Sequence, residues 1–219
     1  MAVIFDCDGV LVDSERLVSR IEAKLFRRWG WEVSPEELGA LLKGRGHTEV
    51  VRIIESHLPV QPPADWIYEW AMHTAIGFRR ALQPVEGVRG VLDTLAARDV
   101  PVAVASQSSH GRVLLSLELC RLSDYFGDHV YTASMVRHPK PAPDIYLHAA
   151  RQLGAAPDRC TVIEDSVTGV RSAVAAGMRV LGYAADADAD ALQQAGAEVF
   201  ERMEELAIRL DATPAAPKP

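Results

Sequence analysis

From residue 85 onward the chain alternates between short apolar runs and stretches whose apolar residues recur at helical spacing. The apolar runs cover residues 102–105, 129–132, 160–163 and 179–182. The stretches with helical spacing cover residues 88–98, 109–121, 143–153 and 167–176. Short runs of this kind, separated by helices, are typical of strands buried on both faces of a parallel sheet. The pattern predicts an α/β fold with a doubly wound, mainly parallel Rossmann-like sheet.

The first apolar run, residues 2–5, belongs to the same sheet but is separated from the other strands by a long helical stretch. Helical spacing recurs over residues 14–28, 34–42, 48–56 and 65–81, and no convincing strand interrupts it. Ser14 and Ser34 are candidate N-caps, and Pro35 stands where a helix favours proline. We therefore expect an inserted all-helical cap domain.

The predicted domain boundaries follow from this change of pattern. Residues 1–14 and 85–210 form the α/β core domain, and residues 15–84 form the helical cap domain. Residues 186–210 add at least one further helix and a weak strand at 198–200. The tail, residues 211–219, is rich in Ala and Pro, and we expect it to be disordered.

Composition narrows the class of protein. A net charge of −7 and the absence of a basic cluster argue against a nucleic-acid surface. Three cysteines without metal-finger spacing favour a reducing compartment. With no run that would span a membrane and no secretion signal, we expect a cytoplasmic protein that does not bind membranes. A monomer is the simplest expectation for its oligomeric state.

Polar side chains gather where the predicted strands end. Asp6 and Asp8 follow the first strand, Ser106 and Gln107 follow the strand at 102–105, and Glu164 and Asp165 follow the strand at 160–163. Lys140, flanked by prolines, follows the strand at 129–132 after a longer loop. Parallel sheets bind ligands at the carboxyl ends of their strands, so these residues are expected to converge on one site.

Each of these residues also has an ordinary structural interpretation. Asp-x-Asp-Gly could be a polar turn, the serines after residue 105 could cap the next helix, and Lys140 could be a surface lysine. Glu164 and Asp165, however, are adjacent acids at the end of a buried strand and would repel each other without a cation. A magnesium ion would relieve that conflict, with Asp165 as a direct ligand and Glu164 acting through water.

With these residues in hand, the chain resembles the haloacid dehalogenase superfamily, in the phosphatase and β-phosphoglucomutase-like subgroup that carries a cap after its first motif. Its sequence is similar to those of bacterial sugar-phosphate phosphatases of the 6-phosphogluconate phosphatase type. The motifs occur in order as FDCDGVLVDS at residues 5–14, VASQS at 104–108, HPKPAPD at 138–144 and VIEDSVTGVRSAVAAGM at 162–178. The resemblance covers nearly everything from Val3 to Leu210.

The resemblance implies a magnesium-dependent phosphatase acting on small phosphorylated metabolites, such as sugar phosphates or phosphosugar acids. Asp6 would attack phosphorus to give an aspartyl phosphate, and Asp8 would act as general acid and then base. Ser106, Gln107 and Lys140 would bind the phosphoryl group. Asp6, the main-chain carbonyl of Asp8 and Asp165 would hold the Mg²⁺, with Glu164 in support.

Alternatives of three kinds stand beside a phosphatase within this resemblance: other cleavage chemistries, a mutase and a non-catalytic binding protein. Dehalogenases carry no acid at the position of Asp8, and Asp8 also disfavours the phosphonate-cleaving branch. The nearer rival is a β-phosphoglucomutase-type mutase, whose cap arginine is matched by His47 and whose cap-helix histidine is matched by Val18. A non-catalytic binding protein of the same fold is the third alternative.

The cap would identify the leaving group. Lys43, Arg45 and His47, in a loop with Gly44 and Gly46, are the candidate cap residues that face the substrate. A solvated surface is the other interpretation of Arg45. Trp66 and Trp70 recur at helical spacing and are expected in the core of the cap.

Overall fold

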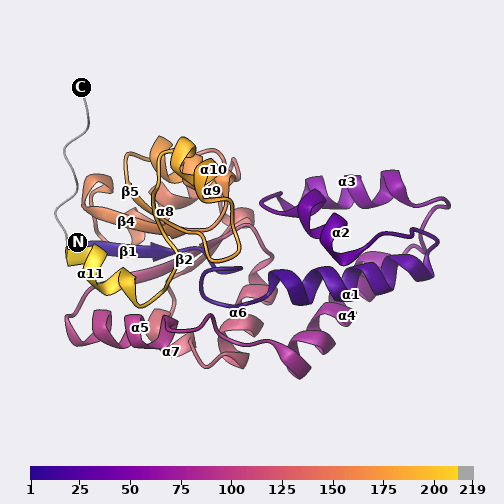
Figure 1. Ribbon diagram of the computed structural model, residues 1–219, viewed down its shortest axis with the longest axis horizontal. Helices are drawn as coiled ribbons and strands as arrows, with labels where there is room; N and C mark the ends of the chain where they lie inside the picture. The colour runs from indigo at the N-terminus through magenta and orange to yellow at the C-terminus, as the bar shows by residue number, and fades with distance from the viewer. Residues whose placement is uncertain (212–219) are drawn as a thin grey trace.

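The computed structural model describes residues 1–211, and its centre is a six-stranded sheet in the order β3-β2-β1-β4-β5-β6 (Figure 1). The strands are β1 (Ala2–Phe5), β2 (Val102–Ser106), β3 (Val130–Thr132), β4 (Cys160–Glu164), β5 (Arg179–Tyr183) and β6 (Glu198–Phe200). Every neighbouring pair is parallel, and β1 pairs with both β2 and β4. The predicted fold class is confirmed, and the first strand lies in the middle of the sheet.

Helices cover both faces of the sheet. One face packs against α5 (Val88–Ala97), α6 (His110–Leu119), α7 (Ser123–Phe126) and α11 (Glu205–Asp211). The other face packs against α8 (Asp144–Gln152), α9 (Val167–Ala175) and α10 (Ala189–Ala195). Side chains of a strand alternate between faces, so Val3 and Phe5 join the first core while Ala2 and Ile4 join the second. Two short 3₁₀ helices, η1 (Ala133–Met135) and η2 (Pro157–Arg159), complete this part.

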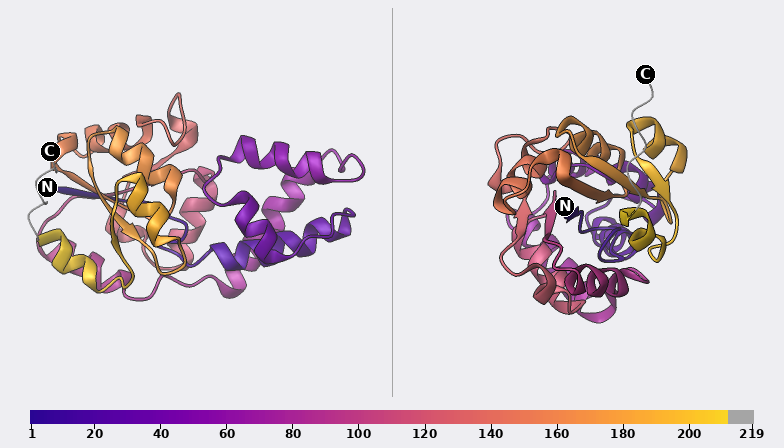
Figure 2. Two further views of the ribbon diagram at one scale, coloured as in Figure 1. Left: turned by 45° about the horizontal axis from the view of Figure 1, so that its top comes forward. Right: turned by 90° about the vertical axis from the view of Figure 1, so that its left-hand side faces the viewer.

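The helical insertion has an apolar core of its own. It consists of α1 (Glu15–Arg28), α2 (Pro35–Leu42), α3 (His47–His57) and α4 (Trp66–Ala81). Phe26 lies in the centre of an aromatic cluster, 5.5 Å from the ring of Trp31, and Trp66 stacks on Trp70 at 5.9 Å. The two tryptophans are therefore buried, as expected. Figures 1 and 2 place these helices beyond the end of the sheet to which the β1 arrow points.

The chain enters and leaves the insertion at adjacent points. Asp13 N donates to Gln83 O at 2.9 Å, and Val85 N donates to Leu11 O at 3.0 Å. An antiparallel bridge joins Val12 to Pro84 between these two hydrogen bonds. We propose that the domain boundaries, predicted at residues 14/15 and 84/85, lie at this double crossing.

Ser14 and Ser34, the two candidate N-caps, use their hydroxyl groups in different ways. Ser34 caps α2 with a capping box, because its hydroxyl accepts from Glu37 N and the Glu37 carboxylate accepts from Ser34 N. Ser14 is the N-cap residue of α1, as predicted, but its side chain makes no capping hydrogen bond. Its hydroxyl donates instead to Asp8 Oδ1 at 2.6 Å.

Two further expectations concern the ends and the surface of the chain. Asp211 closes α11, and the rest of the predicted disordered tail, residues 212–219, lies outside the described residues. Within residues 1–211 no helix combines the length and the apolar character needed to cross a bilayer.

Candidate active site

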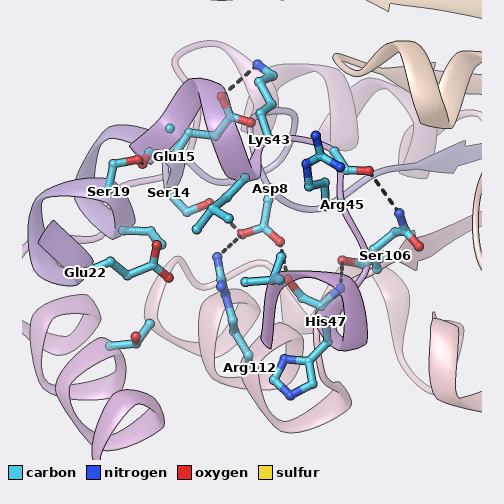
Figure 3. Close-up of a pocket in the computed structure, with 18 of the residues that line it drawn as sticks. Asp8, Ser14, Glu15, Ser19, Glu22, Lys43, Arg45, His47, Ser106 and Arg112 are labelled. Atoms are coloured by element: carbon cyan, nitrogen blue, oxygen red, sulfur yellow. Dashed lines mark hydrogen bonds and ion pairs between the residues drawn. The ribbon is translucent and has the colours of Figure 1, made fainter. Parts of the chain in front are cut away.

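A pocket of about 1000 Å³ lies between the carboxyl ends of the strands and helices α1, α2 and α4. It brings together nearly all of the residues predicted from the sequence. Those that line it are Asp6, Asp8, Lys43, Arg45, His47, Ser106, Gln107, Lys140 and Asp165. Figure 3 shows the central part, with Asp8 between side chains of α1 and α6. Glu164 does not line the pocket, because its side chain is buried beneath Lys140.

Lys140 is the cation at the floor of this pocket. Its Nζ donates to Asp6 Oδ1 at 2.7 Å, to Glu164 Oε1 at 2.7 Å and to Ala105 O at 2.9 Å. The Lys140 side chain is only 2% exposed and lies over the ring of Tyr146. Its three N–H groups thus donate to residues at the carboxyl ends of three strands, β1, β2 and β4. Lys140 is therefore a buried cation with a fixed orientation and not a surface lysine.

Glu164 has a full set of protein donors. Its Oε1 accepts from Lys140 and from the Tyr146 hydroxyl at 2.8 Å, and its Oε2 accepts from the backbone N–H groups of Asp165 and Ser166. Gly169 is required beside it, because a Cβ there would lie 1.7 Å from Glu164 Oε1. These contacts position Lys140. The predicted support of a metal ion by Glu164 through water stays a prediction.

Asp8 is held by residues from three elements. Oδ1 accepts from the Ser14 hydroxyl and from Arg112 Nη2 at 2.9 Å, and Oδ2 accepts from the Ser108 hydroxyl at 2.7 Å. Burial alone would raise the pKa of Asp8, but Arg112 and the two hydroxyl groups outweigh it, so that pKa lies below its ordinary value. The carboxylate of Asp8 is therefore both fixed in orientation and held in its ionised form.

Arg112 was not found from the sequence. It lies in the first turn of α6, and its guanidinium packs 5.2 Å from the centre of the Phe78 ring of α4. The available signal was its place six residues beyond Ser106, on the helix that follows a strand carrying site residues. An arginine in the first turn of a helix is usually solvated. Arg112 lies in the pocket because α4 packs over α6.

Lys43 brings α2 into contact with the predicted metal ligand. Its Nζ lies 2.7 Å from Glu15 Oε2 and 3.0 Å from Asp165 Oδ2. Gln107 Nε2 donates to Gly44 O at 3.2 Å, which makes a second contact between the same loop and the sheet. Ser106 Oγ accepts from Ser108 N at 3.1 Å and so shapes the loop after β2.

Arg45 and His47 differ in how much of them is free to meet a ligand. Arg45 Nε donates to Leu41 O at 2.7 Å, and its guanidinium also pairs with Glu49, one helical turn ahead. The ring of His47 stacks on Trp70 at 5.6 Å, and burial lowers the pKa of this histidine. His47 therefore presents a neutral imidazole edge, whereas the charge of Arg45 is largely used within the insertion.

The acids of the site fit a divalent cation. Burial raises the pKa of Asp6 to about 7, and burial also raises the pKa of Asp165, with Glu15, Glu164 and Asp6 adding to the effect. The Asp165 carboxylate lies against the backbone of Gly9, where a Cβ would come within 2.4 Å of Asp165 Oδ2. Lys140 and Lys43 each lie within 3.0 Å of one of these two carboxylates, and carboxylate oxygens beside a close backbone approach are the donors that Mg²⁺ prefers.

Within residues 1–211 no group of three or more His, Cys, Asp or Glu side chains is arranged to hold a metal ion. The predicted set consists of the carboxylates of Asp6 and Asp165 and the main-chain carbonyl of Asp8, with Glu164 in support, and it stays a prediction. Magnesium commonly keeps several waters and needs few protein ligands.

The sequence of this chain matches a known family. Residues 1–177, most of the chain, match the family of haloacid dehalogenase-like hydrolases. The chain belongs to this family. The resemblance drawn from the motifs is confirmed, and the predicted enzyme class, a phosphoric monoester hydrolase, agrees with it.

Named relatives of this hydrolase include phosphatases and a mutase. It is 31% identical over 188 residues to 6-phosphogluconate phosphatase of Escherichia coli (strain K12), covering 84% of this chain and 83% of that protein. A crystal structure of a hydrolase of this family from Deinococcus radiodurans R1, with bound phosphate and sodium, has a TM-score of 0.79 at 33% identity and covers 95% of this chain and 94% of that one. The putative β-phosphoglucomutase from Thermotoga maritima has a TM-score of 0.80 at 29% identity, with 95% and 97% covered.

The haloacid dehalogenase-like hydrolase also carries a buried acid on α1 that the sequence analysis passed over. Glu22 is 4% exposed, lines the pocket and accepts a hydrogen bond from Trp70 Nε1 at 2.9 Å. Burial raises its pKa from 4.5 to about 7, against the lowering effect of Arg112 and Trp70. The periodic pattern does not predict its burial, because residue 22 looks like one of the polar positions of an amphipathic helix.

Replacing Glu22 by glutamine is expected to stabilise this hydrolase at alkaline pH. The wild-type contribution of Glu22 is fully present below pH 4.5 and is lost as the pH rises through about 7, because the folded state resists ionisation. Relative to wild type, the variant should gain up to about 3 kcal/mol in free energy of unfolding at pH 8 and little at pH 4.5. Urea unfolding at both pH values measures the difference. The matched change Glu36→Gln, at an exposed position, should show no such trend, and an equal effect of Glu22→Gln at both pH values would contradict the expectation.

Proposed function

We propose that this enzyme hydrolyses small phosphorylated sugars or phosphosugar acids, with Mg²⁺, through an aspartyl phosphate on Asp6. One observation carries the proposal: Asp6 and Asp8 stand at the floor of one pocket, and Lys140 holds Asp6 from below at 2.7 Å. The phosphatase and hydrolase relatives support the same chemistry.

Asp6 is the proposed nucleophile. Lys140 occupies Oδ1, whereas Oδ2 accepts no hydrogen bond within residues 1–211 and is the oxygen that we assign to the attack. A bond forms between this oxygen and phosphorus as the ester P–O bond breaks, and the leaving oxygen takes a proton. Water then attacks the aspartyl phosphate, loses a proton and releases inorganic phosphate. Lys140 and the loop after β2, with Ser106 and Gln107, would balance charge on the phosphoryl oxygens.

Asp8 is the proposed proton donor to the leaving oxygen and acceptor from water. In the arrangement described here Arg112 favours its ionised form, which suits the second step. The charge of a bound phosphate ester acts in the opposite direction, because a nearby anion raises the pKa of a carboxyl group. We therefore infer that substrate binding helps to load the proton that Asp8 delivers.

The magnesium ion would be held by the carboxylates of Asp6 and Asp165 and the main-chain carbonyl of Asp8. When bound, it would offset the negative charge of the phosphate group. Lys43, which lies 3.0 Å from Asp165 Oδ2, brings positive charge from α2 to the same place. The helices α1–α4 would exclude water from the first step and contact the leaving group, with Lys43, Arg45 and His47 as proposed contacts.

The experiment is a measurement of phosphate release, with magnesium, over sugar phosphates, phosphosugar acids and nucleotides, including β-glucose 1-phosphate. Release that requires Asp6 would support the proposal and identify the substrate class. Conversion of β-glucose 1-phosphate without release, primed by a bisphosphate, would instead mean a mutase. If no phosphate is released and no compound is converted, the result would favour a binding protein.

Asp8→Asn gives a sharper prediction, because its effect depends on the leaving group. An asparagine cannot donate the proton, so kcat on a sugar phosphate should fall by about 10²- to 10⁴-fold. The loss should be much smaller in the burst of p-nitrophenol from p-nitrophenyl phosphate, since that leaving group departs without a proton. Stopped-flow absorbance measures this burst. Equal losses on both substrates would contradict the acid role of Asp8.

A further inference from the structure

Beyond Asp8, the pocket carries an acid and a base that face each other without a direct ion pair. Glu22 projects from α1 and Arg112 from α6, and Figure 3 shows the carboxylate of the first and the guanidinium of the second on the same side of Asp8. Each perturbs the titration of the other, yet within residues 1–211 no salt bridge joins them. The space between them is therefore flanked by a carboxyl group on one side and a guanidinium group on the other.

Both groups have bonding capacity to spare. Glu22 Oε1 accepts from Trp70 Nε1, whereas its Oε2 accepts no hydrogen bond from the described residues. Arg112 uses Nη2 on Asp8 Oδ1, and its Nη1 donates no hydrogen bond within residues 1–211. Donor and acceptor atoms that lack protein partners can bind the polar groups of a ligand, so this pair is suited to a ligand that completes its hydrogen bonds.

The position of the pair defines which part of a substrate it would meet. Arg112 contacts the same Asp8 oxygen that is held by Ser14, and Asp8 is the group proposed to protonate the leaving oxygen. The leaving group is bonded through the ester oxygen that Asp8 would protonate. We therefore assign it to the side of Asp8 on which Arg112 and Glu22 lie. The first substituents beyond the ester oxygen are the ones that reach this pair.

An acceptor facing a donor is complementary to a hydroxyl group. A hydroxyl can donate to Glu22 and accept from Arg112 at once. A carboxylate in the same place would accept from Arg112 but has no hydrogen to donate to Glu22, and an apolar group would leave both without partners.

We infer that Glu22 and Arg112 form a hydroxyl-reading subsite, which selects phosphate esters with a hydroxyl on the carbon next to the phosphorylated one. This inference rests on the proposed function and narrows its substrate class to polyol and sugar phosphates that carry this hydroxyl. Val18 and Phe78 contribute apolar side chains to the same pocket, and the guanidinium of Arg112 lies against the Phe78 ring.

The test uses two substrates that differ by one hydroxyl group, glycerol 3-phosphate and 3-hydroxypropyl phosphate, on the full chain with magnesium. The wild-type kcat/KM should favour glycerol 3-phosphate by at least about 10²-fold, because the site would otherwise leave buried polar groups unpaired. Glu22→Gln keeps an acceptor for Trp70 but turns the free oxygen into a donor, and it should reduce this ratio to within about 10-fold. The change Glu55→Gln, at an exposed position of α3 that does not line the pocket, is the matched control and should leave the ratio in place.

Several results would overturn the inference. A wild-type ratio near unity, with release that still needs Asp6, would remove the hydroxyl-reading subsite and leave the proposed phosphatase intact. A ratio that is unaffected by Glu22→Gln would do the same. A preference for 2-phosphoglycolate, which carries a carboxylate in place of the hydroxyl-bearing carbon, would show Arg112 acting as an anion receptor. No release from any compound would overturn the proposed function and this inference with it.

Discussion

Replacing Asp6 by asparagine is expected to reduce phosphate release by at least about 10⁴-fold, because the amide cannot attack phosphorus or carry the phosphoryl group. The fold should survive the change. Asparagine matches the size of aspartate, and burial already favours the neutral form of Asp6, whose pKa is about 7. Steady-state release on the best substrate, with thermal unfolding measured in parallel, separates loss of chemistry from loss of structure.

The control for this variant is Asp158→Asn, the same chemical change on the exposed helix η2. It should leave both activity and unfolding temperature close to wild type. Trapping with acid during turnover of a ³²P-labelled substrate adds a direct readout, since label should remain on the wild-type chain and not on Asp6→Asn. Turnover by Asp6→Asn at more than a few per cent of wild type would contradict the nucleophilic role.

Replacing Lys140 by methionine is expected to remove activity and to cost about 3–5 kcal/mol in free energy of unfolding. The apolar side chain fills similar space, but it leaves Asp6 and Glu164 beside each other without the buried cation that lies 2.7 Å from both. Chemical denaturation at pH 7 measures the loss of stability, and phosphate release measures the loss of activity.

A second variant separates the two roles of Lys140. In Lys140→Met combined with Glu164→Gln, one uncompensated charge is removed, so part of the lost stability should return while activity stays absent. A double variant no more stable than Lys140→Met would show that charge compensation is not the reason for the loss. Activity in either variant would exclude Lys140 from phosphoryl binding.

Much of the fold could be predicted because the local signals agreed with the global arrangement. Residues 2–5 are continuously apolar, and the structure places them at the centre of a sheet covered on both faces. The convergence of Asp6, Lys140 and Asp165 followed from a rule about parallel sheets, that strand ends meet at one edge.

The remaining site residues depend on how the helical insertion lies against the sheet, which no local pattern contains. Arg112 and Glu22 look like solvated positions of amphipathic helices, and they become pocket residues only because α1 and α4 pack near α6. Ser14 shows the same limit at the scale of one side chain. Its hydroxyl oxygen could accept a capping hydrogen bond from the helix or its O–H could donate to a neighbour, and in the structure it donates to Asp8 Oδ1.

The bridge between Val12 and Pro84 makes the helical insertion topologically equivalent to a short turn. The sheet needs only two chain ends that meet there, so its register does not depend on how many helices the excursion contains. An insertion whose ends meet in this way can be lengthened, shortened or exchanged as one module. The carboxylates proposed for catalysis and the residues that the insertion contributes to the pocket can then change separately, and exchange of the insertion at this bridge would give new leaving-group preferences on the same proposed phosphoryl-transfer centre.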